Sequence, residues 1–173
     1  MNSGAESGSI SGWIQNGASE VIIDSGGQLN SGYNPFNGKF CFAGGYGRAT
    51  PSRLVQTVRL VGGVQGFTEQ QLDSGARLVE TSFHYQTYDT FFMKNDLVEV
   101  TLNFRSASMS VISTRSSGKL ACRKSNPGWC SHMMQDRLPP GARSVDYAMT
   151  FHREDLVGSA IDCYIDDNSL IIR

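Results

Sequence analysis

The chain has 173 residues, and its 15 Lys and Arg against 16 Asp and Glu give a formal net charge of −1. Charged residues make up 18% of the chain, less than the roughly 25% usual for soluble domains. Without a basic excess the chain is not expected to bind nucleic acid, and its 19 Gly and 21 Ser argue against a helical bundle. The longest apolar run, residues 40–43, is far shorter than the ~20 residues of a spanning helix. We therefore expect no membrane insertion.

Residues 1–9 consist largely of Gly, Ser and other small or polar residues and predict a flexible lead-in, followed by a single domain over residues 10–173. Apolar and polar residues alternate over residues 79–85, 97–104 and 144–151, which indicates strands with one buried face. Weaker strands are predicted, in chain order, at residues 10–15, 20–24, 39–42, 54–61, 88–93, 107–113, 119–122, 159–165 and 169–172. Helical turns are predicted only at residues 68–73 and 152–157.

The separators between these segments carry the chemistry of turns, among them Asn37-Gly38, Gly62-Gly63 and Ser117-Gly118. Short alternating strands with frequent turns are typical of sandwiches and jelly rolls. The predicted fold is therefore an all-β antiparallel sandwich or jelly roll of about ten to twelve short strands. Residues 122–143 are the least regular part and are interpreted as a long excursion along one edge.

The four cysteines fall into two kinds of surroundings. Cys122 and Cys130 flank a turn at residues 126–128 that can bring them together. The sequence leaves two alternatives for this pair, a disulfide or two free thiols. Cys41 and Cys163 each lie in an apolar, strand-like segment. We interpret these two as buried free thiols.

The sequence predicts no catalytic residue, no metal site and no cofactor. It has only three His, and none of its Ser lies in a Gly-x-Ser-x-Gly elbow. The oxygen-rich group at Asp162 and residues 166–168 can attract a hard cation, but a hairpin turn is the simpler interpretation. The run His152-Arg153-Glu154-Asp155 is likewise interpreted as a solvated corner rather than an acid–base pair.

Binding candidates come from two places. The glycine-rich stretch at residues 44–48 offers a Tyr and an Arg in what is expected to be a loop, and one strand places a His among aromatic residues. The His also has a plain interpretation, as a sheet-surface residue packed between strands. The candidate binding residues are Tyr46, Arg48, His84, Tyr85, Tyr88 and Trp129.

Three stretches within residues 21–120 resemble the globular heads of the C1q/TNF-like family. Residues 29–40 are similar to that family's strand–turn–strand signature, residues 93–100 to its turn into a late strand, and residues 113–120 loosely to its last segment. The chain departs from the family pattern at residues 44–46 and at Asn95, and residues 121–173 have no counterpart. The resemblance implies a jelly roll that forms trimers and binds ligands without catalysis.

Eleven of the 15 basic residues are Arg, a residue that is enriched at protein interfaces. Our main hypothesis is a non-enzymatic recognition or assembly domain, the head or spike of a larger extracellular or virion-surface protein, which self-associates and binds a protein or glycan receptor. One alternative is a lectin-like carbohydrate-binding module that uses stacking platforms chosen from Trp13, Tyr33, Tyr85, Tyr88 and Trp129. The other is a β-sandwich enzyme that acts on glycans.

Overall fold

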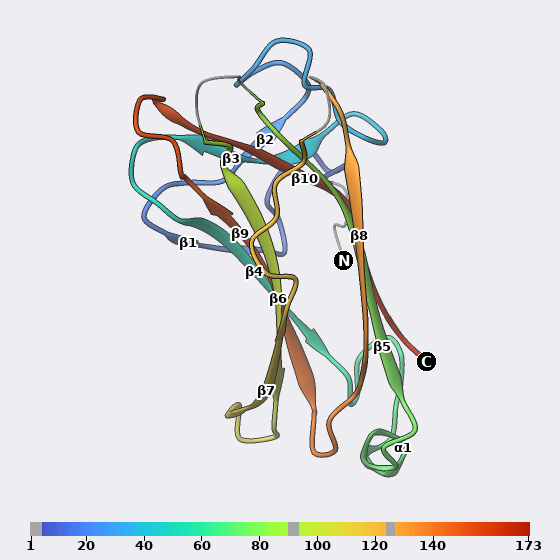
Figure 1. The fold of residues 1–173 in the computed structure, drawn as a ribbon. Coiled ribbons are helices and arrows are strands. Elements are labelled where there is room, and N and C mark those ends of the chain that lie inside the picture. The colour runs from blue at the N-terminus through green and yellow to red at the C-terminus, as the bar shows by residue number, and fades with distance from the viewer. Residues whose placement is uncertain (1–4, 90–93, 124–126) are drawn as a thin grey trace.

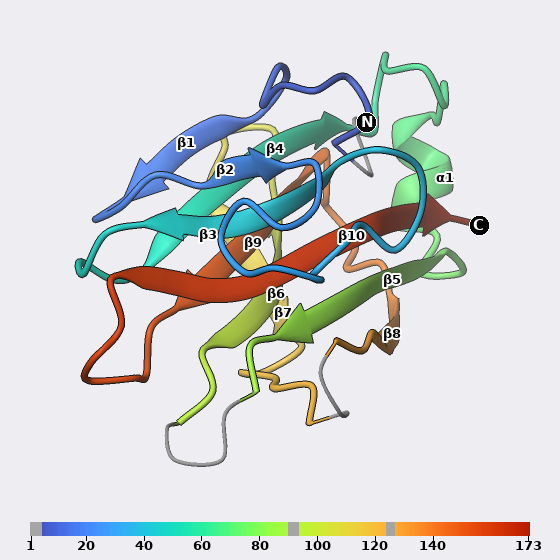
Figure 2. The ribbon, with the colours of Figure 1, turned by 90° about the horizontal axis from the view of Figure 1, so that it is seen from above.

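The computed structural model describes residues 5–89, 94–123 and 127–173. Two five-stranded antiparallel sheets pack face to face, as predicted (Figure 1, Figure 2). We name each sheet after its central strand. The β9 sheet has the order β1 (Ile14–Gly17), β4 (Ser52–Arg59), β9 (Ser144–His152), β6 (Leu97–Arg105), β7 (Val111–Ser116), and the β10 sheet has the order β2 (Ile22–Asp24), β3 (Cys41–Tyr46), β10 (Ala160–Ile172), β5 (Leu78–Thr87), β8 (Cys130–Arg137).

The three strongest alternating segments form the strands β5, β6 and β9, and their apolar side chains build the core. Val98 of β6 lies opposite Phe151 of β9, and every second pair along these strands repeats the arrangement. The side chains between these positions point away from the core, because successive side chains of a strand lie on opposite faces of the sheet. The core members contributed by β6 and β9 are Val98, Val100, Leu102, Phe104, Val145, Tyr147, Met149 and Phe151.

The β10 strand is longer than the sequence predicted. The two segments expected at residues 159–165 and 169–172 form one strand, interrupted by a β-bulge after Asp166. Asp167 adopts the left-handed conformation with φ 50°, which Asp tolerates better than most residues. Across the core, the Tyr147 hydroxyl donates a hydrogen bond of 2.8 Å to Asn168 Oδ1. The acidic run is therefore a bulge inside a strand and not the predicted hairpin turn.

The edge strand β8 lies in the region that was interpreted as irregular. Its eight residues pair with β5 from Arg137 opposite Leu78 to Cys130 opposite Tyr85. Its side chains are at most half-buried, because an edge strand presents polar residues to water. The strand begins at a disulfide between Cys122 and Cys130. Cys41 and Cys163 are free and buried, which confirms that prediction.

Two helical turns were predicted and one is present. The helix α1 (Glu69–Asp73) begins at a capping box in which Thr68 and Gln71 exchange side-chain and backbone hydrogen bonds. Residues 152–157 are not helical, because the Asp96 carboxylate accepts hydrogen bonds from the backbone N–H groups of Glu154 (2.7 Å) and Asp155 (3.3 Å). The corner therefore wraps around a buried carboxylate.

Three weaker strand predictions differ from the structure. Residues 88 and 89 are not in a strand, and 90–93 lie outside the described residues. Only Leu120 of the segment 119–122 pairs, through an isolated bridge to Val98. Residues 106–110 form a tight turn, with Met109 at φ 64°, so the strand there starts at Val111.

The N-terminal segment is fixed to the sandwich wherever the structure describes it. Ala5 is buried in the core, and the Glu6 carboxylate accepts hydrogen bonds from the backbone N–H groups of Lys39 (2.9 Å) and Phe40 (3.2 Å). Ala5 and Glu6, expected in a flexible lead-in, therefore contact the body of the protein.

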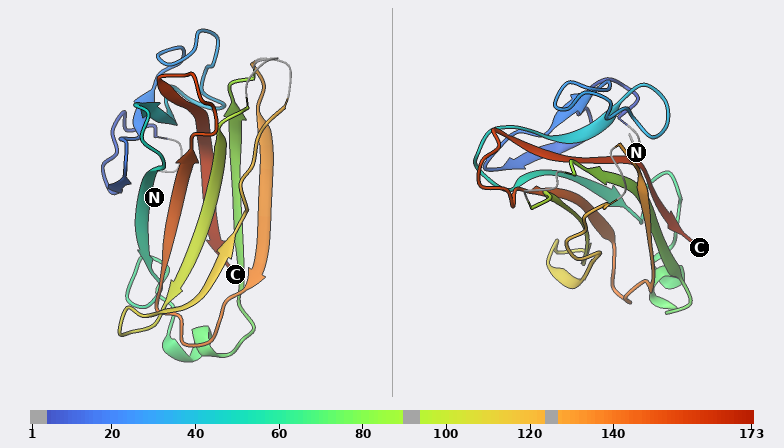
Figure 3. Two further views of the ribbon diagram at one scale, coloured as in Figure 1. Left: turned by 60° about the vertical axis from the view of Figure 1, so that its left-hand side comes forward. Right: turned by 45° about the horizontal axis from the view of Figure 1, so that its top comes forward.

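The loop between β2 and β3 covers part of the outer side of the β10 sheet. It packs a second apolar cluster of Tyr33, Cys41, Ala43 and Tyr164 against that side. Its course is fixed by Asp24, whose Oδ1 accepts the N–H of Gly26 at 2.6 Å. The left view of Figure 3 shows β4, β9, β6 and β7 of the other sheet side by side, with α1 at their lower end.

Candidate functional site: the outer face of the β9 sheet

The structure does not bring the six predicted binding residues together. Tyr85 points into the core and is 8% exposed. Tyr88 is half-buried and packs on Tyr33, with ring centroids 5.6 Å apart. Tyr46 and Arg48 are exposed beyond the glycines of β3. Residues 44–46 continue a strand rather than starting a loop, and the Tyr46 hydroxyl donates to the carbonyl of Gln28 at 2.9 Å.

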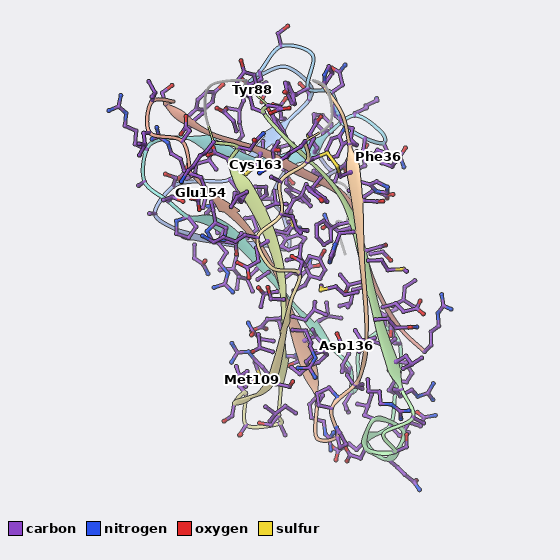
Figure 4. The ribbon with its side chains drawn as sticks, in the orientation of Figure 1. Phe36, Tyr88, Met109, Asp136, Glu154 and Cys163 are labelled. Atoms are coloured by element: carbon purple, nitrogen blue, oxygen red, sulfur yellow. A yellow bond between two sulfur atoms is a disulfide. The ribbon has the colours of Figure 1, made fainter. Side chains whose placement is uncertain are left out.

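Two of the six, His84 and Trp129, belong to one small aromatic group with Phe36. The rings of Phe36 and His84 stack with centroids 3.6 Å apart and an interplanar angle of 10°. Trp129 meets Phe36 edge-on at 5.9 Å, and its Nε1 donates to the carbonyl of Asn34. His84 Nδ1 also lies 3.7 Å from Asp167 Oδ2. In Figure 4, Phe36 lies beside β8 at the opposite end of the molecule from Met109.

The outer face of the β9 sheet carries a denser set of polar groups. Here the name covers the outward-pointing side chains of its five strands. Cross-strand register aligns them in rows, so that Arg53 lies beside Thr150, Thr57 beside Asp146, and Arg59 beside Ser144. On the other side of β9, the rows continue through β6 and β7. These residues are Glu99, Thr101, Asn103, Arg105, Thr114 and Ser116.

The middle of this face is formed by the covered side chains of β9. The outward side chains of β9 are almost fully enclosed: Asp146 is 5% exposed, Ala148 is 0% exposed and Thr150 is 8% exposed. Several of their neighbours on β4 and β6 are longer, among them Arg53 and Arg105. We name this strip along β9, together with the polar side chains on either side of it, the trough.

Hydrogen bonds fix the polar groups in the trough. Arg105 Nε lies 2.5 Å from Asp146 Oδ2, while the Thr57 hydroxyl donates to Asp146 Oδ1 at 2.7 Å. Glu99 accepts from the Ser116 hydroxyl at 2.5 Å and lies 3.1 Å from His152 Nε2. Burial by itself would raise the pKa of Glu99, but the hydrogen bonds from Ser116 and His152 outweigh it and the pKa is lowered. Glu99 is therefore held ionised, and both carboxylates are paired.

Three polar side chains of the same face have no hydrogen-bond partner among the described residues. They are Arg53, whose Nε is enclosed, Arg59, and Ser144, whose hydroxyl is enclosed. A buried donor without an acceptor costs roughly 1–3 kcal/mol, so such groups need water or a ligand. Of these groups, Arg59 is exposed at one end of the face, whereas the Nε of Arg53 and the hydroxyl of Ser144 are covered by neighbouring atoms.

A depression of about 470 Å³ lies at the lower end of the trough. The outer-face residues Thr57, Arg59 and Ser144 line it together with Met109 of the β6–β7 turn. Arg143 also lines it but is bound by Asp73, with its Nη2 2.8 Å from Asp73 Oδ2. A second depression of about 520 Å³ adjoins the open edge of β4 beside Val64 and Leu170.

The structure offers no grouping of metal ligands within residues 5–89, 94–123 and 127–173. The carboxylates of Asp166 and Asp96 are instead occupied by backbone N–H groups. Burial raises the pKa of Asp96 and of Asp162, and raises that of Asp166 to about 6. Within the described part of the chain, no helix combines the length and apolar character needed to cross a membrane.

The polar halves of the strands were predictable from the sequence, but only as residues that face solvent. Glu99, Thr101, Asn103 and Asp146 were recognisable as outward-facing residues from their alternation with apolar neighbours. The alternation does not show which strands are neighbours. Only the pairing of β4 with β9 places Arg53 and Arg59 on the same face as Asp146. The candidates chosen for their aromatic character lie elsewhere, one of them in the core.

No family model and no curated protein matches this chain. Several solved structures are similar to it. The enzymatically active domain of tailspike protein 4 of bacteriophage CBA120 is similar with a TM-score of 0.65 at 14% identity, over 100% of this chain and 21% of that chain. The structure TmCBM61, determined with β-1,4-galactotriose, has a TM-score of 0.62 at 17% identity, over 98% and 94%. The CBM22-1 xylan-binding domain of Paenibacillus barcinonensis Xyn10C has a TM-score of 0.52 at 14% identity, over 98% and 91%.

The chain thus spans about a fifth of the tailspike chain and nearly the whole of the two modules. The similar structures are mainly carbohydrate-binding modules. They overturn our main hypothesis of a self-associating recognition or assembly head and favour the carbohydrate-binding alternative. The resemblance to C1q/TNF-like heads stays a prediction. At these identities the comparisons show the fold alone, an antiparallel β-sandwich that carbohydrate-binding modules also have.

Proposed function

We propose that this protein binds carbohydrate on the outer face of the β9 sheet. The observation that carries the proposal is the trough itself: a floor of nearly enclosed β9 side chains, bordered by polar groups that hydrogen bonds hold in place. Fixed polar groups recognise a ligand at low entropic cost because their rotamers are already chosen. The similarity to carbohydrate-binding modules supports the proposal at the level of the fold.

The chemistry of the trough suits a ligand rich in hydroxyl groups. A sugar hydroxyl both donates and accepts, and the face presents donors in Arg53 and Arg59 and an acceptor in the partly exposed Glu99. Asn103 adds an amide, which does both, beside Asp146. A linear glycan lying along the strands therefore meets donors and acceptors in succession.

We propose binding without cleavage. A glycosidase needs one carboxylic acid whose pKa is raised so that it can donate a proton, beside a second, ionised carboxylate. On this face, the pKa of Glu99 is lowered, and Asp146 is held by Arg105. Asp96 and Asp166, whose pKa values are raised, lie elsewhere and accept hydrogen bonds from backbone N–H groups.

We further propose that the protein works outside the cell. The Cys122–Cys130 disulfide supports this, because such bonds persist mainly in oxidising compartments. A secreted or surface location also fits a protein that meets polysaccharides.

Filling the trough tests the proposal. We expect Thr101→Trp, in the middle of the outer face, to weaken the binding of any glycan found on an array at least tenfold, because the indole occupies the floor above Ala148. Ser82→Trp is the matched control, since Ser82 occupies an outward position in the middle of β5 on the other sheet. Affinities are measured by titration calorimetry, with near-UV circular dichroism to show that both variants are folded.

Two results contradict the proposal. One is the absence of any glycan ligand for the wild-type protein on the array. The other is a ligand whose affinity is the same in Thr101→Trp but is lost in Trp129→Ala, which would move the site to the aromatic group of Phe36, His84 and Trp129. Release of reducing sugar ends during incubation with the bound glycan would overturn the non-catalytic part.

A further inference from the structure

We propose that the glycan bound by this protein is acidic, and that Arg53 and Arg59 bind the carboxylates of its uronic acid units. This inference rests on the proposed function and names its ligand class. It starts from the balance of charge on the outer face of the β9 sheet, which differs from the net charge of −1 for the whole chain.

The two carboxylates of this face are already bound by neighbouring side chains. Asp146 is paired with Arg105 at 2.5 Å, and Glu99 is bonded to Ser116 and lies 3.1 Å from His152. The positive charges of Arg53 and Arg59 are not paired, since neither guanidinium contacts a carboxylate or carbonyl of the described residues. Arg53, Arg59 and Arg105 against Asp146 and Glu99 give this face a formal charge of +1. At the lower depression, Glu69 and Asp73 both lie against Arg143.

The placement of the two arginines matches an extended polymer. Both lie on the outward side of β4, and six residues along a strand span about 20 Å. Arg53 lies beside Thr150 at one end of the trough, and Arg59 lines the depression of about 470 Å³ at the other. A polysaccharide lying along β4 meets both cations, whereas a monosaccharide meets only one.

The guanidinium group favours a carboxylate over a neutral hydroxyl. Its planar fork forms two parallel hydrogen bonds to a carboxylate, and these charge-assisted bonds are roughly twice as strong as neutral ones. Arg59 is exposed and approachable, and the exposed Thr57 lines the same depression. The lower depression can thus hold one carboxylate together with a neighbouring sugar hydroxyl.

The test compares polymers that differ only in charge. Polygalacturonate and alginate are each titrated beside their methyl-esterified forms, and we expect the wild-type protein to bind the acid forms at least tenfold more tightly. Arg53→Gln and Arg59→Gln should each weaken binding of the acid form about fivefold or more, with little effect on the esters. Arg53→Lys keeps the charge but not the fork and should lose less than Arg53→Gln.

The matched control is Arg137→Gln, which removes one positive charge from the outward side of β8 on the other sheet. Its affinity for the acid polymers should equal that of the wild type. Measurements at two salt concentrations separate a bound carboxylate from general attraction, because general attraction weakens equally in all three Gln variants as salt rises.

Each other outcome is informative. Equal affinity for acid and ester forms, or a neutral glycan bound through the trough with no binding of either polyuronate, overturns the acidic ligand and leaves carbohydrate binding intact. Equal affinity for dextran sulfate, with the same losses in the variants, overturns the carboxylate in favour of a general polyanion site. Failure to bind every polymer and every array glycan overturns the proposed function itself.

Discussion

Single buried carboxylates determine the course of the connections in this sandwich. Asp24 orders the loop after β2, Asp96 holds the corner after β9, and Asp166 binds the segment at Phe36. Each accepts backbone N–H groups that would otherwise be left without partners, which is costly inside a protein. At the scale of the residue, burying one Asp thus fixes a loop of many residues.

Asp166 gives a prediction for the pH dependence of stability. Burial raises its pKa to about 6 in the folded protein, although the N–H groups of Phe36, Asn37 and Asp167 oppose that rise. The folded state therefore keeps a proton that the unfolded state has lost, and the free energy of unfolding falls as pH rises from about 4 to about 6. The expected fall is at most about 3 kcal/mol.

Urea unfolding at pH 4, 5 and 6 measures this fall. Asp166→Asn does not titrate, so its free energy of unfolding should change less over the same interval than that of the wild type. The comparison isolates Asp166 from Asp96 and Asp162, whose pKa values burial also raises. Parallel curves for the two proteins would show that Asp166 does not titrate in this range.

Individual elements differ in how far the sequence could predict them. The strands β6 and β9 were predictable almost to the residue, because each buries one face and alternates strictly. The edge strand β8 was not, since its inward side chains, such as His132 and Asp136, are polar and only half-buried. It exists because the backbone of β5 offers a free edge, a property of its partner and not of its own sequence.

The short helix α1 depends on one apolar anchor. Leu72 is fully buried in the core, whereas the rest of its five residues face solvent or bind Arg143. We expect Leu72→Ala to lower the free energy of unfolding by about 2–5 kcal/mol, since it removes buried methyl groups and leaves a cavity. The exposed Gln70→Ala in the same helix is the control and should change it by less than about 0.5 kcal/mol. Similar urea midpoints for both variants would contradict this role.

At the scale of the whole molecule, two sheets enclose the core between them, and their two outer faces are covered differently. The outer side of the β10 sheet receives the loop between β2 and β3 and its apolar cluster around Tyr33. The outer face of the β9 sheet keeps its rows of polar side chains and has a depression at one end. This asymmetry places the proposed ligand on one side of the molecule only.

The sheet order also predicts where the fold opens first. β9 and β10 are each paired on both edges, whereas β7 and β8 end their sheets and pair on one edge only. Amide hydrogen exchange followed by mass spectrometry should therefore be slowest in peptides from residues 144–152 and 160–166, and faster by at least tenfold in residues 111–116 and 130–137. Equal protection of central and edge strands would contradict this strand order.

The sequence by itself determined the β class, the alternation of the main strands, the buried thiols of Cys41 and Cys163, and the helical turn at residues 68–73. These are local properties, set by side-chain period and turn chemistry over a few residues. Only the tertiary structure decided which strands are neighbours, because pairing joins backbones far apart in the chain. That pairing placed Arg53 and Arg59 beside the β9 floor and moved Tyr85 from a proposed binding surface into the core.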